Sequence, residues 1–134
     1  SADDVLWEDD DAAAASPADE EALTRLREAF LASEWAPLQP IDVETEIDFT
    51  DPDPFGDGTP HVVICKLDAV YRRGDRIEIV DWKTGRPPRT EAERTERMLQ
   101  LELYRRAYHA KHGVPTDQID VVLFYVGDGI VIRG

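Results

Sequence analysis

A carboxylate and an ammonium stand two residues apart in a segment whose other residues are typical of a buried strand. These are Asp81 and Lys83, within the stretch Ile-Val-Asp-Trp-Lys-Thr-Gly at residues 79–85. Because side chains alternate faces along a strand, both should point to the same side, together with Ile77 and Ile79. Charged groups in such a place need a partner or a function. Taken alone, the motif is more typical of a structural ion pair at the end of a strand.

A second carboxylate, Asp68, changes that interpretation. A turn at residues 72–75 predicts a hairpin that brings residues near 68 opposite residues near 80, so Asp68, Asp81 and Lys83 should converge. Two carboxylates and the backbone carbonyl of Trp82 would form a set of hard oxygen ligands suited to Mg²⁺ or Mn²⁺. Such a cation activates water and stabilises charge on a phosphate, and a nearby lysine assists. The set is suitable for phosphodiester hydrolysis.

Two polar side chains on a later predicted helix, Gln100 and Tyr104, are four residues apart and therefore share a face. Both can donate and accept hydrogen bonds with a phosphate or a base. The alternative for this segment is an ordinary amphipathic helix.

The elements that must position these residues follow the order α-β-β-β-α-β-β, which predicts an α/β domain with a central mixed sheet flanked by helices. Ser16 and Pro17 begin a helix that should end near residue 33. Alternation, turn residues and apolar runs predict the remaining elements. They are strands at 43–49, 62–71, 76–83, 119–126 and 130–133 and a helix at 90–112. We expect residues 1–15 to form an acidic tail or linker and residues 16–134 to form the domain.

Charge is distributed unevenly over the 134 residues. The net charge is −14, yet residues 1–21 carry nine acidic groups and residues 42–57 carry seven, with no basic group in either stretch. Residues 58–134 hold 13 basic and 11 acidic groups, so the half with the candidate site is slightly positive and compatible with a nucleic acid. The single cysteine excludes an internal disulfide and a cysteine-based iron–sulfur or zinc cluster. It also fits a reducing, cytoplasmic setting. No apolar run reaches membrane-spanning length, so we expect no membrane partner.

Together, Asp68, the run Asp81-Trp-Lys-Thr-Gly85 and Gln100-x-x-x-Tyr104 resemble the RecB-type nuclease domain of the PD-(D/E)xK superfamily. The resemblance covers roughly residues 40–134. Within that superfamily the sequence looks most like the C-terminal nuclease domain of actinobacterial helicase-nucleases of the AdnAB or UvrD-like type.

The resemblance implies a restriction-endonuclease-like fold and a fragment of an ATP-dependent helicase that processes and repairs DNA ends. Asp68 and Asp81 would be metal ligands together with the Trp82 carbonyl, and Lys83 would be the catalytic lysine. Gln100 and Tyr104 would position the DNA or support Lys83. The implied cofactor is Mg²⁺ or Mn²⁺, and the partners are a single-stranded DNA end, helicase domains of the same chain and a second helicase-nuclease subunit. No phosphate-binding loop of the ATPase type occurs in the sequence, so ATP would bind only in the helicase domains.

Two departures from the family pattern concern the metal site. Cys65 stands where the family has a glycine. The family also places a histidine ligand in an N-terminal helix, whereas residues 1–60 contain none, and His61, His109 and His112 do not match that position. We therefore expect the chain to begin after that helix, with a weakened metal site and low or absent activity in isolation. Glu44 or Glu46 is the candidate substitute.

Two other functions stay open at this stage. One is a catalytically inactive nuclease-like module that holds DNA or assembles subunits. The other is an acidic protein-interaction domain, which requires Asp68 and Asp81 to lie apart.

Overall fold

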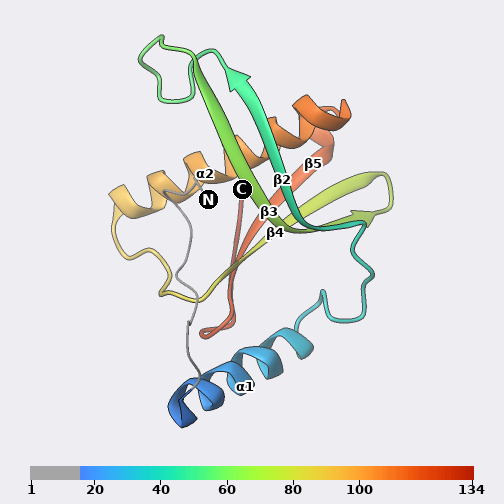
Figure 1. Cartoon of the computed structure of the whole chain (residues 1–134), viewed down its shortest axis with the longest axis vertical. Coiled ribbons are helices and arrows are strands. Elements are labelled where there is room, and N and C mark those ends of the chain that lie inside the picture. Colours follow the sequence, from blue (N-terminus) through green and yellow to red (C-terminus); the bar gives the residue numbers. More distant parts are fainter. Residues whose placement is uncertain (1–15) are drawn as a thin grey trace.

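The computed structural model describes residues 16–134, and the predicted acidic tail at 1–15 lies outside the described residues (Figure 1). The elements follow the predicted order. They are α1 (Pro17–Leu31), β2 (Asp42–Asp51), β3 (His61–Arg73), β4 (Arg76–Lys83), α2 (Glu91–His112), a short 3₁₀ helix (Thr116–Gln118), β5 (Ile119–Tyr125) and β6 (Ile130–Arg133). The strands β2 and β3 are longer than expected at both ends.

The strands form one five-stranded sheet in the order β2-β3-β4-β5-β6. All neighbouring pairs are antiparallel except β4 and β5, which are parallel and connected through α2. A parallel pair needs such a crossover because the chain must return to the starting end of the sheet. The predicted α/β class with a mixed sheet is confirmed, and it is consistent with a restriction-endonuclease-like fold.

Both helices begin with a capping box. At α1 the side chain of Ser16 accepts from the backbone N–H of Asp19, and the Asp19 side chain accepts from the N–H of Ser16. Thr90 and Glu93 make the equivalent exchange at α2, which ends at Gly113 in the left-handed conformation (φ 72°). Within the described residues, neither helix has the length and apolar composition that crossing a membrane requires.

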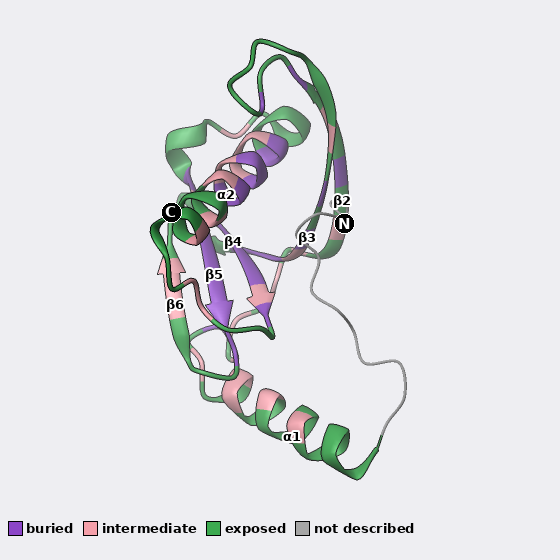
Figure 2. Cartoon of the chain, turned by 90° about the vertical axis from the view of Figure 1, so that its left-hand side faces the viewer, coloured by how far each residue is buried: buried purple, intermediate pink, exposed green. Residues whose placement is uncertain are grey.

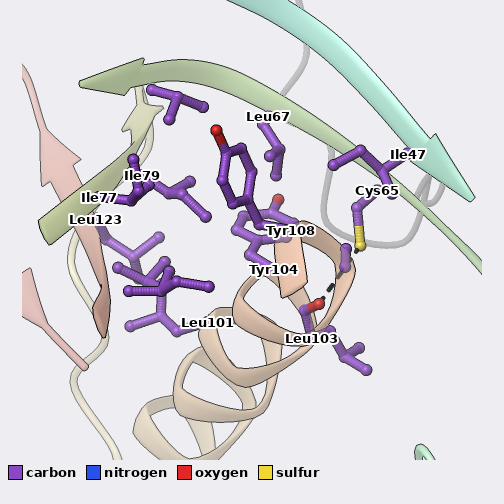
Figure 3. Close-up of a cluster of buried hydrophobic side chains, with 14 of the residues drawn as sticks. Ile47, Cys65, Leu67, Ile77, Ile79, Leu101, Leu103, Tyr104, Tyr108 and Leu123 are labelled. Atoms are coloured by element: carbon purple, nitrogen blue, oxygen red, sulfur yellow. Dashed lines mark hydrogen bonds between the residues drawn. The ribbon is translucent and has the colours of Figure 1, made fainter. Parts of the chain in front are cut away.

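Apolar side chains from the sheet form a separate core on each face. One core lies between the sheet and α2 and includes Leu67, Ile79 and Leu101 (Figure 3). The other lies on the opposite face, where Trp35, Val80 and Phe124 are buried and α1 adds partly buried side chains. Figure 2 shows this difference: α2 has a buried stripe, whereas α1 has only intermediate and exposed residues.

A polar network ties the segment after α1 to the second core. The indole N–H of Trp35 donates to the buried Glu78 carboxylate at 2.7 Å, and Arg133 contacts the same carboxylate at 3.1 Å. Arg73 also lies within 3.2 Å of Glu78. The burial of Glu78 is therefore offset by three polar partners, one from the segment after α1, one from β3 and one from β6.

Candidate active site

The predicted site residues lie where β3 separates from β4. The strand β3 pairs with β2 from His61 to Val70, but with β4 only from Ala69 to Arg73. Residues 81–83 of β4 therefore pair with β5 alone and have an open edge on the side of β3. We call this place the strand fork, defined by Asp68 on β3 and Asp81 on β4. In Figure 1 the first half of β3 runs with β2 away from β4.

The carboxylate of Asp68 takes over part of the pairing that is lost at the fork. Its Oδ2 accepts a hydrogen bond from the backbone N–H of Trp82 at 2.9 Å. A backbone N–H that leaves a ladder inside a protein needs another acceptor. Asp68 therefore has a structural task, and that task brings its carboxylate to the end of β4.

Side-chain alternation shifts by one residue at the fork. Cys65 and Leu67 face α2 on the first half of β3, and Val70 faces it on the second half, whereas Ala69 belongs to the opposite core. The residue of β2 that falls between the pairs flanking Asp68 is Glu44, which has a positive φ of 49°. Irregular pairing of this kind redirects side chains locally. Here it allows Asp68 to reach the face of β4 that carries Asp81.

Asp81 and Lys83 form a buried ion pair on the α2 side of β4. The Lys83 Nζ lies 3.0 Å from Asp81 Oδ2, and both residues are buried. Burial raises the pKa of the Asp81 carboxyl well above its usual range, a hydrogen bond with the Asp68 carboxyl adds to that rise, and Lys83 opposes it. The two carboxyls are thus close enough to share a proton, with an ammonium beside them.

The helix α2 brings the other two predicted residues to the same place. Gln100 is fully buried, and its Nε2 donates to the Tyr104 hydroxyl at 2.9 Å. The pKa of Tyr104 is raised well above its usual value, first by burial and then by electrostatic interaction with Asp81, Cys65 and Asp68. Tyr104 therefore stays protonated at neutral pH and lies within electrostatic reach of both acids. The Gln100 Oε1 has no hydrogen-bond partner among the described residues.

The arrangement of Asp68, Asp81 and Lys83 agrees with a comparison of the whole sequence against protein families. A model described as "PD-(D/E)XK nuclease superfamily" matches residues 2–132. The chain belongs to the PD-(D/E)XK nuclease superfamily. A search of curated proteins found no match. Membership suggests metal-dependent hydrolysis of nucleic-acid phosphodiesters, while the RecB type and a helicase context have no support from these comparisons.

The donor set at the fork fits, in part, the divalent cation that PD-(D/E)XK nucleases typically use. Two adjacent carboxylates supply hard oxygen donors, and a cation would offset both the burial of the Asp81 charge, which is the main cause of its raised pKa, and the repulsion from Asp68. Within residues 16–134, however, no group of three or more His, Cys, Asp or Glu side chains is placed to hold a metal ion. Neither Glu44 nor Glu46 joins Asp68 and Asp81 in such a group within these residues. A substitute ligand from β2 stays a prediction.

One residue beside the pair could not be recognised from the sequence. Tyr125 on β5 is the Cα partner of Lys83, is 1% exposed and belongs to the core on the α2 side. It ends a long apolar run, so nothing in the sequence distinguishes it from an ordinary core residue. The parallel register of β4 and β5 makes it the strand neighbour of Lys83.

Proposed function

We propose that the chain is an Mg²⁺- or Mn²⁺-dependent DNA nuclease domain that uses the strand fork as its active site. The observation that carries the proposal is the meeting of Asp68, Asp81 and Lys83 from two strands, with the two carboxyls close enough to share a proton. An acidic interaction domain required these two acids to lie apart, so the geometry speaks against it.

Each residue has a distinct proposed task. Asp68 and Asp81, with the Trp82 carbonyl, would hold the cation, which when bound supplies Lewis acidity and neutralises phosphate charge. Lys83 would stabilise the negative charge that develops on the phosphate, because its ammonium is already fixed beside Asp81. Gln100 would fix the Tyr104 ring, whose protonated hydroxyl can donate to a phosphate oxygen. These roles are proposals.

We further propose that the domain is of the RecB type and works in an ATP-dependent DNA helicase-nuclease that processes DNA ends. The order and spacing of Asp68, Asp81-x-Lys83 and Gln100-x-x-x-Tyr104 support this assignment. The helicase would supply ATP hydrolysis and deliver a single-stranded end. Its other domains or a second subunit would cover the acidic stretches at 1–21 and 42–57.

The proposal is tested in two steps on the same chain. The first is titration with Mg²⁺ and Mn²⁺ followed by amide NMR, with the largest shifts expected at Asp68, Asp81 and Trp82. The second is degradation of labelled single-stranded DNA by the wild type, Asp81→Ala and Lys83→Ala. Asp48→Ala removes an exposed acid from β2 and is the matched control. Metal-dependent cleavage that is lost in the two site variants and kept in Asp48→Ala supports the proposal. Equal cleavage by all four proteins contradicts it.

The second candidate is a nuclease-like module that binds metal and DNA without cutting. The absence of a three-ligand group within the described residues favours it. This function is favoured if the chain shows the NMR response to metal and binds DNA, yet leaves the DNA uncleaved at high Mn²⁺ concentration.

A further inference from the structure

Among the arginines of α2, Arg97 is distinguished by its lack of an acidic partner. Arg94 lies 3.6 Å from Glu91, Arg105 lies 2.6 Å from Glu102 and Arg106 lies 2.6 Å from Asp51. Arg97 has no carboxylate within 4 Å in the described part of the chain. It is nonetheless half-buried.

The reason is found one turn earlier in the helix. Glu93 is four residues before Arg97, the usual spacing for a helical ion pair. The Glu93 carboxylate instead accepts both ends of the Arg86 guanidinium, at 3.2 and 2.9 Å, together with the backbone N–H of Arg89. Glu93 is therefore occupied by the loop that follows β4, and the guanidinium of Arg97 keeps its donors available.

The position of Arg97 on the helix directs it towards the strand fork. Residues 97, 100 and 104 are spaced by three and four, so Arg97 shares a stripe with Gln100 and Tyr104. Because α2 returns the chain between two parallel strands, its N-terminal end lies at the end of β4 that carries Lys83 (Figure 1). Arg97 thus stands one turn outward from the buried Gln100, at the rim of the candidate active site.

From these observations we propose that Arg97 is a phosphate-binding residue of the substrate strand. Its planar guanidinium would hold a backbone phosphate next to the phosphate that is cleaved at Asp68 and Asp81. The inference rests on the proposed nuclease function and names a further substrate-positioning contact of that site. A phosphate contact fixes the register of the strand without reading its sequence.

The test measures binding of fluorescent single-stranded DNA by anisotropy in Ca²⁺, at several salt concentrations. Arg97→Gln keeps most of the apolar stem and should weaken binding about tenfold, the loss of one charge-assisted contact. The slope of log K against log salt should become shallower by about 0.7, the value for one phosphate of a single strand. Arg97→Lys should restore the salt slope but only part of the affinity, because lysine returns the positive charge without the planar, two-pronged guanidinium.

The matched control is Arg25→Gln, which removes one exposed positive charge from α1 without touching α2 or the fork. It should leave both the affinity and the salt slope unchanged. Wild-type binding with an unaltered slope in Arg97→Gln, or an equal loss in Arg25→Gln, overturns the role of Arg97 alone. A wild type that shows neither the metal response nor DNA binding contradicts the nuclease proposal itself, and the role of Arg97 falls with it.

Discussion

The Asp68 carboxylate accepts the backbone N–H of Trp82 at 2.9 Å, across the gap where β3 leaves β4. The same carboxyl hydrogen-bonds to that of Asp81 and raises its pKa. A single side chain therefore closes the open edge of one strand and places a second negative charge beside a buried acid. The hydrogen bond to Trp82 stabilises the fold, whereas the second negative charge destabilises it. A substitution that keeps one and removes the other can therefore separate the two effects.

Asp68→Asn should separate them. The amide oxygen can still accept from Trp82, while the like charge beside Asp81 disappears, so the free energy of unfolding should be unchanged or rise by about 1 kcal/mol. The pKa of Asp81 should fall towards its usual range, and any nuclease activity should be lost. Urea denaturation at neutral pH and NMR titration of the Asp81 carboxyl measure the two quantities.

Asp68→Ala is the comparison for that variant. It removes the acceptor as well as the charge, so it leaves the Trp82 N–H without its present partner and should cost roughly 1–3 kcal/mol. Equal destabilisation by Asp68→Asn and Asp68→Ala would show that the hydrogen bond to Trp82 does not explain the stability contribution of Asp68.

The buried ion pair of Asp81 and Lys83 should behave as a coupled unit. Lys83→Met removes the positive charge and the hydrogen bond of Lys83, which both favour the charged form of Asp81, so the Asp81 pKa should rise further and the fold should lose several kcal/mol. The double variant Asp81→Asn/Lys83→Met should be more stable than the sum of the single changes implies, with a coupling free energy of about 1–3 kcal/mol. Additive single and double changes in urea denaturation would contradict a direct interaction at 3.0 Å.

The sequence was sufficient for most of the architecture. Capping residues such as Ser16 and Thr90 marked both helix starts, and the turn at residues 72–75 defined the β3–β4 hairpin. The alternation of Ile77, Ile79 and Asp81 against Val80 also holds, because β4 is a regular strand with a core on each face. These features depend on local preferences and on a period of two, which a single sequence expresses directly.

The strand fork could not be anticipated in the same way. Alternation counted from Leu67 and alternation counted from Val70 assign opposite faces to Asp68, and only the irregular pairing at Glu44 reconciles them. Likewise, the neighbours Lys83 and Tyr125 are 42 positions apart in sequence and meet through the register of a parallel pair. Long-range register depends on the packing of the whole sheet, which no local window contains.

Glu44 holds the left-handed conformation (φ 49°) in an exposed position of β2, so its backbone is strained. Glu44→Gly should remove that strain and raise the free energy of unfolding by up to about 1 kcal/mol. Glu46→Gly is the matched control, because Glu46 is exposed on the same strand without a positive φ and should lose about 1 kcal/mol. Destabilisation of equal size in both variants would argue against strain at residue 44.

The contact between Glu93 and the loop after β4 should be visible as a pH effect. Hydrogen bonds from the Arg86 side chain and then from the Arg89 backbone lower the pKa of Glu93 from 4.5 to about 2. Because the folded pKa lies below the unfolded one, this contribution to stability is fully present above about pH 4.5 and is lost as the pH falls towards 2. Carboxyl NMR titration of Glu93 measures it directly.

Arg86→Ala should raise the Glu93 pKa from about 2 towards 4.5, and the backbone donors at Arg89 and Thr90 should keep it from reaching that value. It should also free Glu93 to pair with Arg97 at the favourable spacing of four residues, so DNA binding should weaken in parallel. The control is Arg94→Ala, because the Arg94 side chain lies 3.6 Å from Glu91 and, within the residues that the structure describes, forms no ion pair with Glu93. It should change neither the Glu93 pKa nor DNA binding. A Glu93 pKa near 4.5 in the wild type, or equal shifts in both variants, would mean that Arg86 does not occupy Glu93 in solution.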